Sequence, residues 1–496
     1  MTNVDRMHAR YLRTCRLLIV ACMLTAAFYL QWLLSAARPE NAILFALLVG
    51  AEVFNVTQAA GFWYTAWMQR WTDAPDADFA ASSETVDVFV TVCGEPADIV
   101  EQTVRAAMAI RHPRLTVWVL DDGRDDAIAA IARRFGTRYL TRAGRDGAKA
   151  GNINNALARA TGDFVVIFDA DHIPVPSFLE RTMPTFEEPR IAFVQTPQSY
   201  RNRDRNLVAA GAHEQQALFY GPIMRGRDRL GAVFSCGTNV VFRREALDAV
   251  GGIPQDSVTE DLRVSLVLVR AGWKSAYLPE VLAEGLGPTD VRSYFGQQRR
   301  WARGGLEILF KRRPFTTKMT FGQFVQYGLG FLYWFNGWAY SVYIVLTLAF
   351  LYFGLRPVQV RSEYPAHFLP YVIVTLITIV YATGFTLTFR ALWFTLASFP
   401  VHIWAFFAAL FGRGRGFVVT PKSGSQRSLG SVWPHVVVVT ALAVSMPFAI
   451  VVQGATPSVM NNVAFAVGHV LIVSGFVVLA IDPEGAEDVA QASDAS

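Results

Sequence analysis

The stretch Phe164-Val-Val-Ile-Phe-Asp-Ala-Asp-His172 runs from five apolar residues directly into a pair of aspartates. A short apolar run bounded by turn residues predicts a strand that is buried on both faces. A second run, Leu115-Thr-Val-Trp-Val-Leu120, leads into Asp121-Asp122-Gly123 in the same way. Ligands of open α/β sheets bind outside the carboxyl ends of the strands, so both acidic clusters are candidate ligand-binding residues.

Two acidic clusters at one sheet edge could hold a nucleoside and a divalent metal ion. Mg²⁺ binds through one or two carboxylates and keeps its other positions for phosphate oxygens and water. The alternative is that aspartate simply follows strands as a turn residue. The pairing of Asp121 and Asp122 with Asp169 and Asp171 strengthens the ligand-site interpretation, and the turn interpretation stays open.

The segment around these clusters, Thr72 to about Pro288, alternates between strand-like and helix-like patterns. This alternation predicts an α/β domain with a largely parallel sheet. The predicted strands are Val86–Cys93, Leu115–Leu120, Phe164–Phe168, Ile191–Gln195 and Asn239–Phe242. The predicted helices include Ala97–Ile110, Asp125–Phe135, Ala148–Ala160 and Glu260–Ala271.

The composition indicates that this domain belongs to a membrane protein. Of 496 residues, 52% are hydrophobic and only 17% are charged, whereas soluble proteins carry about 25% charged residues. The net charge of +5 is locally concentrated and does not indicate nucleic-acid binding. The four cysteines are scattered, which argues against a disulfide framework or a zinc site and favours a reducing cytosolic face.

Apolar windows of bilayer length predict six membrane spans. They are Leu17 to Ala37, Ala42 to Met68, Leu332 to Leu355, Ala366 to Leu387, Val432 to Gln453 and Val463 to Ile481. A seventh stretch, Ala391 to Phe411, is rich in aromatic residues and contains Pro400, and it predicts an interfacial helix. Arginines before the first span and after residue 411 place both termini in the cytoplasm. The acidic, alanine-rich tail, residues 483–496, is expected to be disordered.

Two further motifs lie between the soluble segment and the returning membrane helices. Thr259-Glu260-Asp261 begins a predicted helix, and its simple interpretation is an N-cap with acidic residues in the first turn. Gln297-Gln-Arg-Arg300-Trp301 lies on an amphipathic segment that could instead be a membrane-surface helix with an anchoring tryptophan. Separate interpretations of this kind do not explain why the two acidic clusters, Thr259-Glu260-Asp261 and the Gln297-to-Trp301 motif occur in this order in one chain.

Taken together, the motifs resemble the processive family 2 glycosyltransferases, and within them the bacterial cellulose synthase catalytic subunits. The family pattern of D, DxD, TED and QxxRW is similar to Asp122, Asp169-Ala-Asp171, Thr259-Glu-Asp261 and Gln297 to Trp301. Secondary motifs also resemble the family. They are Ala148-Lys149-Ala150-Gly151-Asn152, Gln195-Thr-Pro197, Phe234-Ser-Cys236-Gly237-Thr238 and the gating-loop sequence Phe417-Val-Val-Thr420-Pro-Lys422.

The chain also departs from this pattern. Gln198-Ser-Tyr200 follows Gln195-Thr-Pro197 where the family has His-Phe-Phe, and Thr238 replaces a serine. These positions belong to the acceptor region of the family, so the product linkage is open. Two spans precede the catalytic segment instead of four, and no C-terminal PilZ barrel that binds cyclic-di-GMP is expected after the last span.

The resemblance implies a GT-A-type fold, an inverting mechanism and a metal ion, Mg²⁺ or Mn²⁺, held by Asp171 and Asp169. It implies catalysis by Asp261 as general base, together with Glu260 and Thr259, and acceptor contacts from Trp301, Cys236 and Gly237. Donor contacts are assigned by the same resemblance to Asp121, Asp122, Lys149, Asp169, Gln297, Arg300, Phe417, Thr420 and Lys422.

The predicted function is the polymerisation of a UDP-sugar, with UDP-glucose and a cellulose-type β-glucan as the leading pair, and export of the polymer. Curdlan-type, mixed-linkage, chitin-type and hyaluronan-type products remain alternatives, as does a non-processive enzyme that glycosylates a lipid carrier. A transporter is disfavoured, because the motifs are intact and the spans lack charged residues. The expected setting is the bacterial inner membrane, with accessory export subunits left open.

These expectations divide the chain into five regions. They are an N-terminal membrane region (1–71), a cytosolic glycosyltransferase domain (72–288), interfacial helices with QxxRW (289–331), a C-terminal membrane region (332–482, with the interfacial helix 391–411 and the gating loop 413–426) and the tail (483–496).

Overall fold

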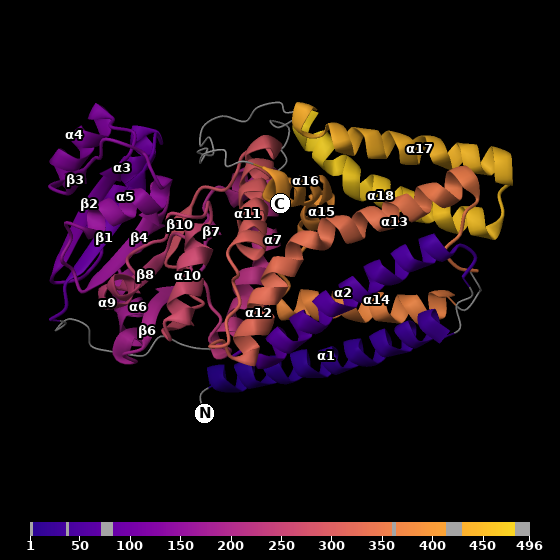
Figure 1. Ribbon diagram of the computed structural model, residues 1–496, viewed down its shortest axis with the longest axis horizontal. Coiled ribbons are helices and arrows are strands. Elements are labelled where there is room, and N and C mark those ends of the chain that lie inside the picture. The colour runs from indigo at the N-terminus through magenta and orange to yellow at the C-terminus, as the bar shows by residue number, and fades with distance from the viewer. Residues whose placement is uncertain (1–2, 36–38, 71–82, 360–363, 413–428, 482–496) are drawn as a thin grey trace.

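The computed structural model describes residues 3–35, 39–70, 83–359, 364–412 and 429–481. Figure 1 shows an α/β domain on the left and a bundle of long helices on the right. The helices α7 (Leu207–Leu218), α11 (Val291–Lys311), α15 (Phe389–Ala397) and α16 (Phe399–Phe411) lie between these two parts. The predicted gating-loop residues Phe417, Thr420 and Lys422 and the tail 483–496 fall outside the described residues.

A seven-stranded mixed sheet forms the centre of the α/β domain. Its strand order is β3-β2-β1-β4-β8-β6-β9, and only β8 runs antiparallel to its neighbours. The strands are β1 (Val86–Val92), β2 (Leu115–Asp121), β3 (Arg138–Leu140), β4 (Phe164–Asp169), β6 (Ile191–Gln195), β8 (Val240–Arg243) and β9 (Lys274–Tyr277). A second, three-stranded sheet has the order β5-β10-β7, with β5 (Ile173–Pro174), β10 (Ala283–Gly285) and β7 (Ser199–Tyr200).

Helices cover both faces of the large sheet. Every residue of β1 is buried, and its side chains alternate between two cores. Val88 and Val90 join one core with Val104 of α3 (Ala97–Met108), whereas Phe89 joins the other with Ile153 of α5 (Ala148–Leu157). Burial on both faces explains why the strand is a continuous apolar run.

Local signals explain where individual helices begin and end. Helix α4 (Asp126–Phe135) begins after Asp125, whose carboxylate accepts a hydrogen bond from the Ala127 amide, and ends at Gly136 with φ of 67°. Helix α11 begins with a capping box in which Asp290 and Ser293 satisfy each other's backbone amides. The remaining helices of the domain are α6 (Phe178–Thr182), α8 (Met224–Arg229), α9 (Arg244–Ala249) and α10 (Glu260–Arg270).

The five predicted strands and four predicted helices of this domain all form, with ends that differ by at most three residues. The predictions did not include β3, β9 or α7. Strand β3 has only three residues and is partly exposed at the sheet edge, and β9 begins with the exposed Lys274. Neither strand has the apolar run on which the strand predictions depended.

Seven helical segments are long and apolar enough to cross a membrane, where six had been expected. The helices are α1 (Asn3–Ser35), α2 (Ala42–Met68), α12 (Phe321–Leu332) continuing into α13 (Asn336–Phe353), α14 (Tyr364–Ala382), α15 with α16, α17 (Trp433–Gln453) and α18 (Pro457–Ile481). The additional segment is the stretch predicted to be interfacial. It is divided at Ser398, and its two helices pack against α7 and α11.

The expectation that the membrane spans lack charged residues is wrong for Glu52. This glutamate lies in α2 and is buried within hydrogen-bonding reach of the hydroxyls of Tyr29 and Tyr343. The Asn55 amide also donates to the Tyr343 hydroxyl at 2.7 Å. A buried carboxyl group in a span needs such partners, and here they join α1, α2 and α13.

Candidate active site

The first acidic cluster ends strand β2, and protein groups already engage both of its carboxylates. Asp121 accepts hydrogen bonds from the amides of Gly123 and Asp125 and from the Tyr139 hydroxyl. Asp122 forms a two-pronged ion pair with Arg142, with Nε–Oδ1 and Nη2–Oδ2 distances of 2.7 and 2.6 Å. The hydrogen bond to Asp122 raises the pKa of Arg142. The cluster therefore shapes and anchors the loop after β2.

The second acidic cluster ends strand β4, and its neighbour β1 separates it from β2 in the sheet. Ligand atoms of Asp169, Asp171 and His172 lie within 4.8 Å of one another. The Leu286 amide donates to Asp171 Oδ2 at 2.9 Å, and the Asp169 amide donates to the Thr238 hydroxyl at 3.0 Å. Carboxylate oxygens at this spacing fit a hard divalent cation.

Lys149, in the first turn of α5, connects the second acidic cluster to the other motifs. Its ammonium group contacts Asp169 Oδ1 and donates to the Gly237 carbonyl at 2.7 Å. Burial alone would lower the pKa of Lys149, but the charges of Asp169 and Glu260 outweigh it and raise that pKa. The same ion pair keeps the pKa of Asp169 low against the opposing effect of burial.

The third acidic cluster begins helix α10, but not as its sequence suggested. Thr259 occupies the N-cap position without a side-chain capping hydrogen bond, and its hydroxyl lies 3.2 Å from that of Ser257. Glu260 and Asp261 occupy the first turn as expected. Burial, followed by the charge of Asp261, raises the pKa of Glu260 to about 7. Burial also raises the pKa of Asp261.

The loop before β8 lies against this acidic pair. Gly237 has φ of 83°, and a Cβ atom there would lie 3.2 Å from Asp261 Oδ2, so the backbone passes directly beside the carboxylate. The Cys236 amide donates to Gln195 Oε1 at 2.8 Å. Burial and the nearby Asp261 raise the pKa of the Cys236 thiol to about 12, which keeps it neutral.

Helix α11 carries the Gln297-to-Trp301 motif to the same place. Gly304 of this helix packs against Thr259, where a Cβ atom would meet the threonine methyl group at 2.4 Å. The charge of Arg300 lowers the pKa values of both Glu260 and Asp261 against the effect of burial. Gln297 and Trp301 are half-buried on the same helix.

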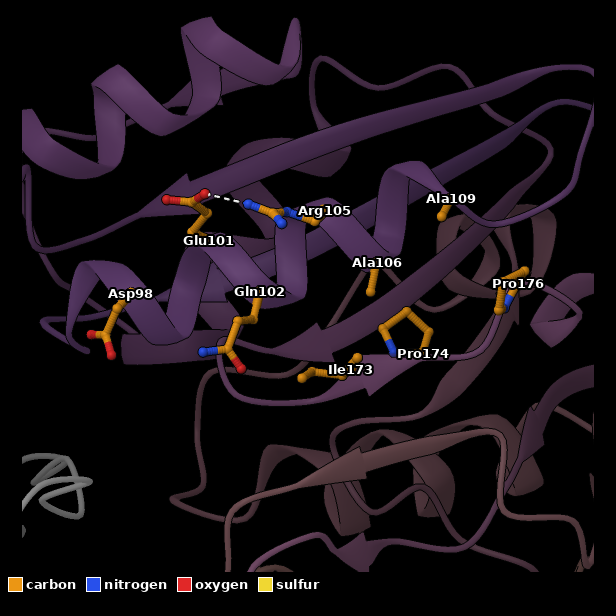
Figure 2. Close-up of a pocket in the computed structure, with 9 residues that line it drawn as sticks. All are labelled: Asp98, Glu101, Gln102, Arg105, Ala106, Ala109, Ile173, Pro174 and Pro176. Atoms are coloured by element: carbon orange, nitrogen blue, oxygen red, sulfur yellow. Dashed lines mark hydrogen bonds and ion pairs between the residues drawn. The ribbon is translucent and has the colours of Figure 1, made fainter.

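The described residues form two cavities of interest, and one of them borders this cluster. One of about 590 Å³ opens next to Glu260 and extends to Gly412, and a cavity of this size suits a small-molecule ligand. Its charged lining comes from Arg145, Asp146, Asp256, Glu260, Arg303, Glu307, Lys311 and Arg312. Figure 2 shows the other, between α3 and residues 173–176, where Glu101 pairs with Arg105. None of the predicted site residues lines this second cavity.

Several residues that organise the site were missed from the sequence. Arg142 and Tyr139 hold the Asp121 and Asp122 carboxylates. The Gln195 side chain, which the sequence placed in a motif without a role, donates to the Thr238 carbonyl at 2.9 Å. Arg142 belongs to a segment with three arginines in eight residues, residues 138–145, and nothing in that pattern distinguishes it. His172 directly follows Asp171, and its position beside the DxD pair was the available signal.

The sheet order and its acidic edge are those of the GT-A-like glycosyltransferase fold. A mannosyltransferase from Pyrobaculum calidifontis, solved with GDP-mannose and Mn²⁺, aligns over 75% of this chain and all of its own length, with a TM-score of 0.51 and 19% identity. At this identity the similarity establishes the fold.

Residues 84–304 match the model for glycosyltransferase-like family 2, and this part of the chain is a family 2 glycosyltransferase domain. A UDP-forming cellulose synthase catalytic subunit of Pseudomonas fluorescens (strain SBW25) is 37% identical over 316 residues, covering 62% of this chain and 43% of the relative. Cellulose synthase 2 of Novacetimonas hansenii is 31% identical over 455 residues, covering 87% of this chain and 28% of the relative. The matched regions span less than half of either relative.

The raised pKa of Glu260 predicts how activity depends on pH. If catalysis requires the Glu260–Asp261 pair to be fully ionised, kcat/KM should increase as pH rises through about 7 and then level off. Glu260→Gln should move this midpoint to lower pH, because the group that titrates near 7 is gone. Initial rates of UDP release from pH 5 to 9 check this, and an unchanged midpoint in Glu260→Gln would contradict it.

Proposed function

We propose that this protein is a processive, inverting β-glycosyltransferase that polymerises a UDP-sugar and moves the polymer across a membrane. The observation that carries the proposal is the convergence of Lys149, Asp169, Asp261 and Arg300 beneath membrane-length helices. The relative named as a UDP-forming cellulose synthase catalytic subunit supports UDP as the leaving group. Both this relative and the one named cellulose synthase 2 support a glucan as product.

In this proposal, the carboxylates of Asp169 and Asp171 bind the metal ion. Their carboxylates and the His172 ring lie close enough to surround one cation, and oxygen ligands suit Mg²⁺ or Mn²⁺. The cation would supply Lewis-acid stabilisation of the diphosphate. Lys149 adds a positive charge beside Asp169, and the anchored loop of Asp121 and Asp122 would meet the uridine end.

Asp261 is the general base of this proposal. It would accept the proton of the acceptor hydroxyl as that oxygen attacks the anomeric carbon from the face opposite the diphosphate. One glycosidic bond forms, the sugar–phosphate bond breaks and UDP leaves, so the configuration inverts. Glu260 lies next to the base, and burial followed by the charge of Asp261 raises its pKa to about 7. Thr259 positions this turn against Gly304 of α11.

The acceptor would lie along α11. Trp301 offers an apolar ring face for the terminal sugar, and Gln297 and Arg300 offer hydrogen-bond donors for hydroxyl and phosphate oxygens. Cys236 and Gly237, beside Asp261, would border the same sugar. By resemblance, Phe417, Thr420 and Lys422 cover the donor, and Gly412 at the 590 Å³ cavity lies just before that segment.

The location and membrane orientation of the protein follow from its proposed role as a polymer-exporting synthase. We place the catalytic domain and both termini in the cytoplasm of a bacterium and the helices in its inner membrane, with α15 and α16 along the cytoplasmic surface. The growing polysaccharide leaves between the helices, and accessory export subunits would receive it. The five regions defined from the sequence serve as the domain division of this proposal.

A panel of UDP-sugars tests the function and the product together. Purified protein with Mg²⁺ should release UDP and form a high-molecular-weight polymer from UDP-glucose, and an endo-β-1,4-glucanase should degrade it. Resistance to this enzyme with sensitivity to a β-1,3-glucanase, or polymer only from UDP-N-acetylglucosamine, would replace the cellulose-type product by one of the alternatives. Transfer of a single sugar to a lipid acceptor would contradict processivity.

Asp261→Asn should reduce polymer synthesis by about 10²–10⁴-fold, the usual contribution of a general base. UDP affinity should remain near that of the wild type, because the base acts on the acceptor and not on the nucleotide. Radiolabelled polymer yield and calorimetric UDP titration measure the two effects. Asp248→Asn, an exposed aspartate paired with Arg244, is the matched control. A variant at position 261 that retained a third of the activity would exclude Asp261 as the base.

Asp171→Asn should weaken the Mg²⁺ dependence of UDP binding, because a carboxylate is removed from a metal with few protein ligands. UDP titrations with Mg²⁺ and with EDTA should differ strongly in the wild type and little in the variant. Asp163→Asn, an aspartate at the opposite end of β4 that accepts hydrogen bonds from Thr85, is the control. Equal metal dependence in wild type and Asp171→Asn would remove Asp171 from the metal site.

A further inference from the structure

His402 is a polar residue in a place that packing alone does not explain. It lies in α16 with no exposed surface, and neither ring nitrogen has a hydrogen-bond partner among the described residues. Leaving a buried donor or acceptor unpaired is energetically unfavourable. A phenylalanine would fill the same space without this cost, so a partner for the imidazole is to be sought in a bound molecule.

The surroundings of His402 are aromatic and belong to the turn between α12 and α13. Its ring meets those of Tyr333 and Trp334 edge-on, with centroid separations of 5.8 and 5.5 Å. Gly337 lets α13 approach α16 closely, because a Cβ atom there would lie 2.8 Å from that of His402. Aromatic rings beside a polar group suit a sugar, which has apolar ring faces and hydroxyl edges.

A line of contacts joins this position to the acceptor tryptophan. Trp301 and Gly305 are four residues apart and therefore share one face of α11. The Trp334 indole covers Gly305, where a Cβ atom would lie 2.7 Å from its Nε1 atom, and Trp334 in turn contacts His402. His402 thus follows Trp301 on the side of the membrane helices.

Helices α11 and α7, which pack against α16 and α15, also carry polar atoms without partners among the described residues. Gln297 Oε1 on α11 and Gln216 Oε1 on α7 are buried without a hydrogen bond among the described residues. The neighbouring Gln215, by contrast, accepts from the Tyr294 hydroxyl at 2.8 Å. Unpaired amide oxygens on α11 and α7, together with the unpaired imidazole on α16, match the donor and acceptor character of sugar hydroxyls.

We propose that His402 hydrogen-bonds to a hydroxyl of the glycan just beyond the sugar that stacks on Trp301, and so retains the chain between additions. This inference rests on the proposed processive function and assigns a positioning role, since His402 contacts the product rather than the reacting atoms. Retention matters because a chain that dissociates after each transfer cannot be elongated.

His402→Phe tests the proposal in the full-length protein with UDP-glucose and Mg²⁺. It keeps the aromatic packing and removes the hydrogen bond, so mean chain length should fall about 3- to 10-fold, the effect of losing one neutral hydrogen bond. UDP affinity should not change, and the melting temperature should not fall. His402→Asn retains an amide donor and should recover part of the length. His367→Phe, a histidine of α14 stacked on Phe28, is the control and should give wild-type chains.

Chains of wild-type length from His402→Phe would overturn the proposal. Equal shortening in His402→Phe and His402→Asn, accompanied by a lower melting temperature in both, would also overturn it and assign His402 to packing. A wild-type protein that transfers only one sugar would overturn the processive function and this inference together, whereas the first two results leave that function intact.

Discussion

The ion pair between Lys149 and Asp169 is the interaction on which the candidate site depends. Lys149 comes from α5 and Asp169 from the end of β4, and the same ammonium group holds the Gly237 carbonyl of the loop before β8. Asp169, Asp171, Glu260 and Asp261 would otherwise place four carboxyl groups in one partly buried region. Concentrated negative charge is costly there unless a cation is present. One lysine therefore connects the metal-binding edge to the catalytic turn.

Helix α11 makes the corresponding connection between chemistry and membrane. At Gly304 it packs against Thr259 of the catalytic turn, and its Ala302 and Leu306 share a buried cluster with Ala405 and Ala409 of α16. A residue with a side chain at 304 would push the helix away from α10. The small residues on this helix thus allow Arg300 to act electrostatically on Glu260 and Asp261 while the helix remains packed on the membrane side.

The sequence predicted most of the sheet because burial leaves a direct pattern. Strands β1, β2, β4 and β6 are apolar runs that end in turn residues, and helix α10 begins at Glu260 as expected. The alternative interpretation of Thr259 as a side-chain cap is not met, since its hydroxyl lies 3.2 Å from that of Ser257 and its methyl group packs against Gly304. Glu52 could have been read from the sequence as an exception among the spans, but its tyrosine partners come from α1 and α13, 23 and 291 residues away.

The sequence by itself determined the fold class and the acidic residues that end the strands, because strand burial and strand-end aspartates are local patterns. It also determined which helices are apolar enough for a membrane. Which charges meet depends on how the whole chain packs. The tertiary structure paired Asp122 with Arg142 and Asp169 with Lys149, and it raised the pKa of Glu260 by burying it beside Asp261. Partners and burial depend on segments 20 to more than 100 residues apart, and only the packing of the whole chain brings them together.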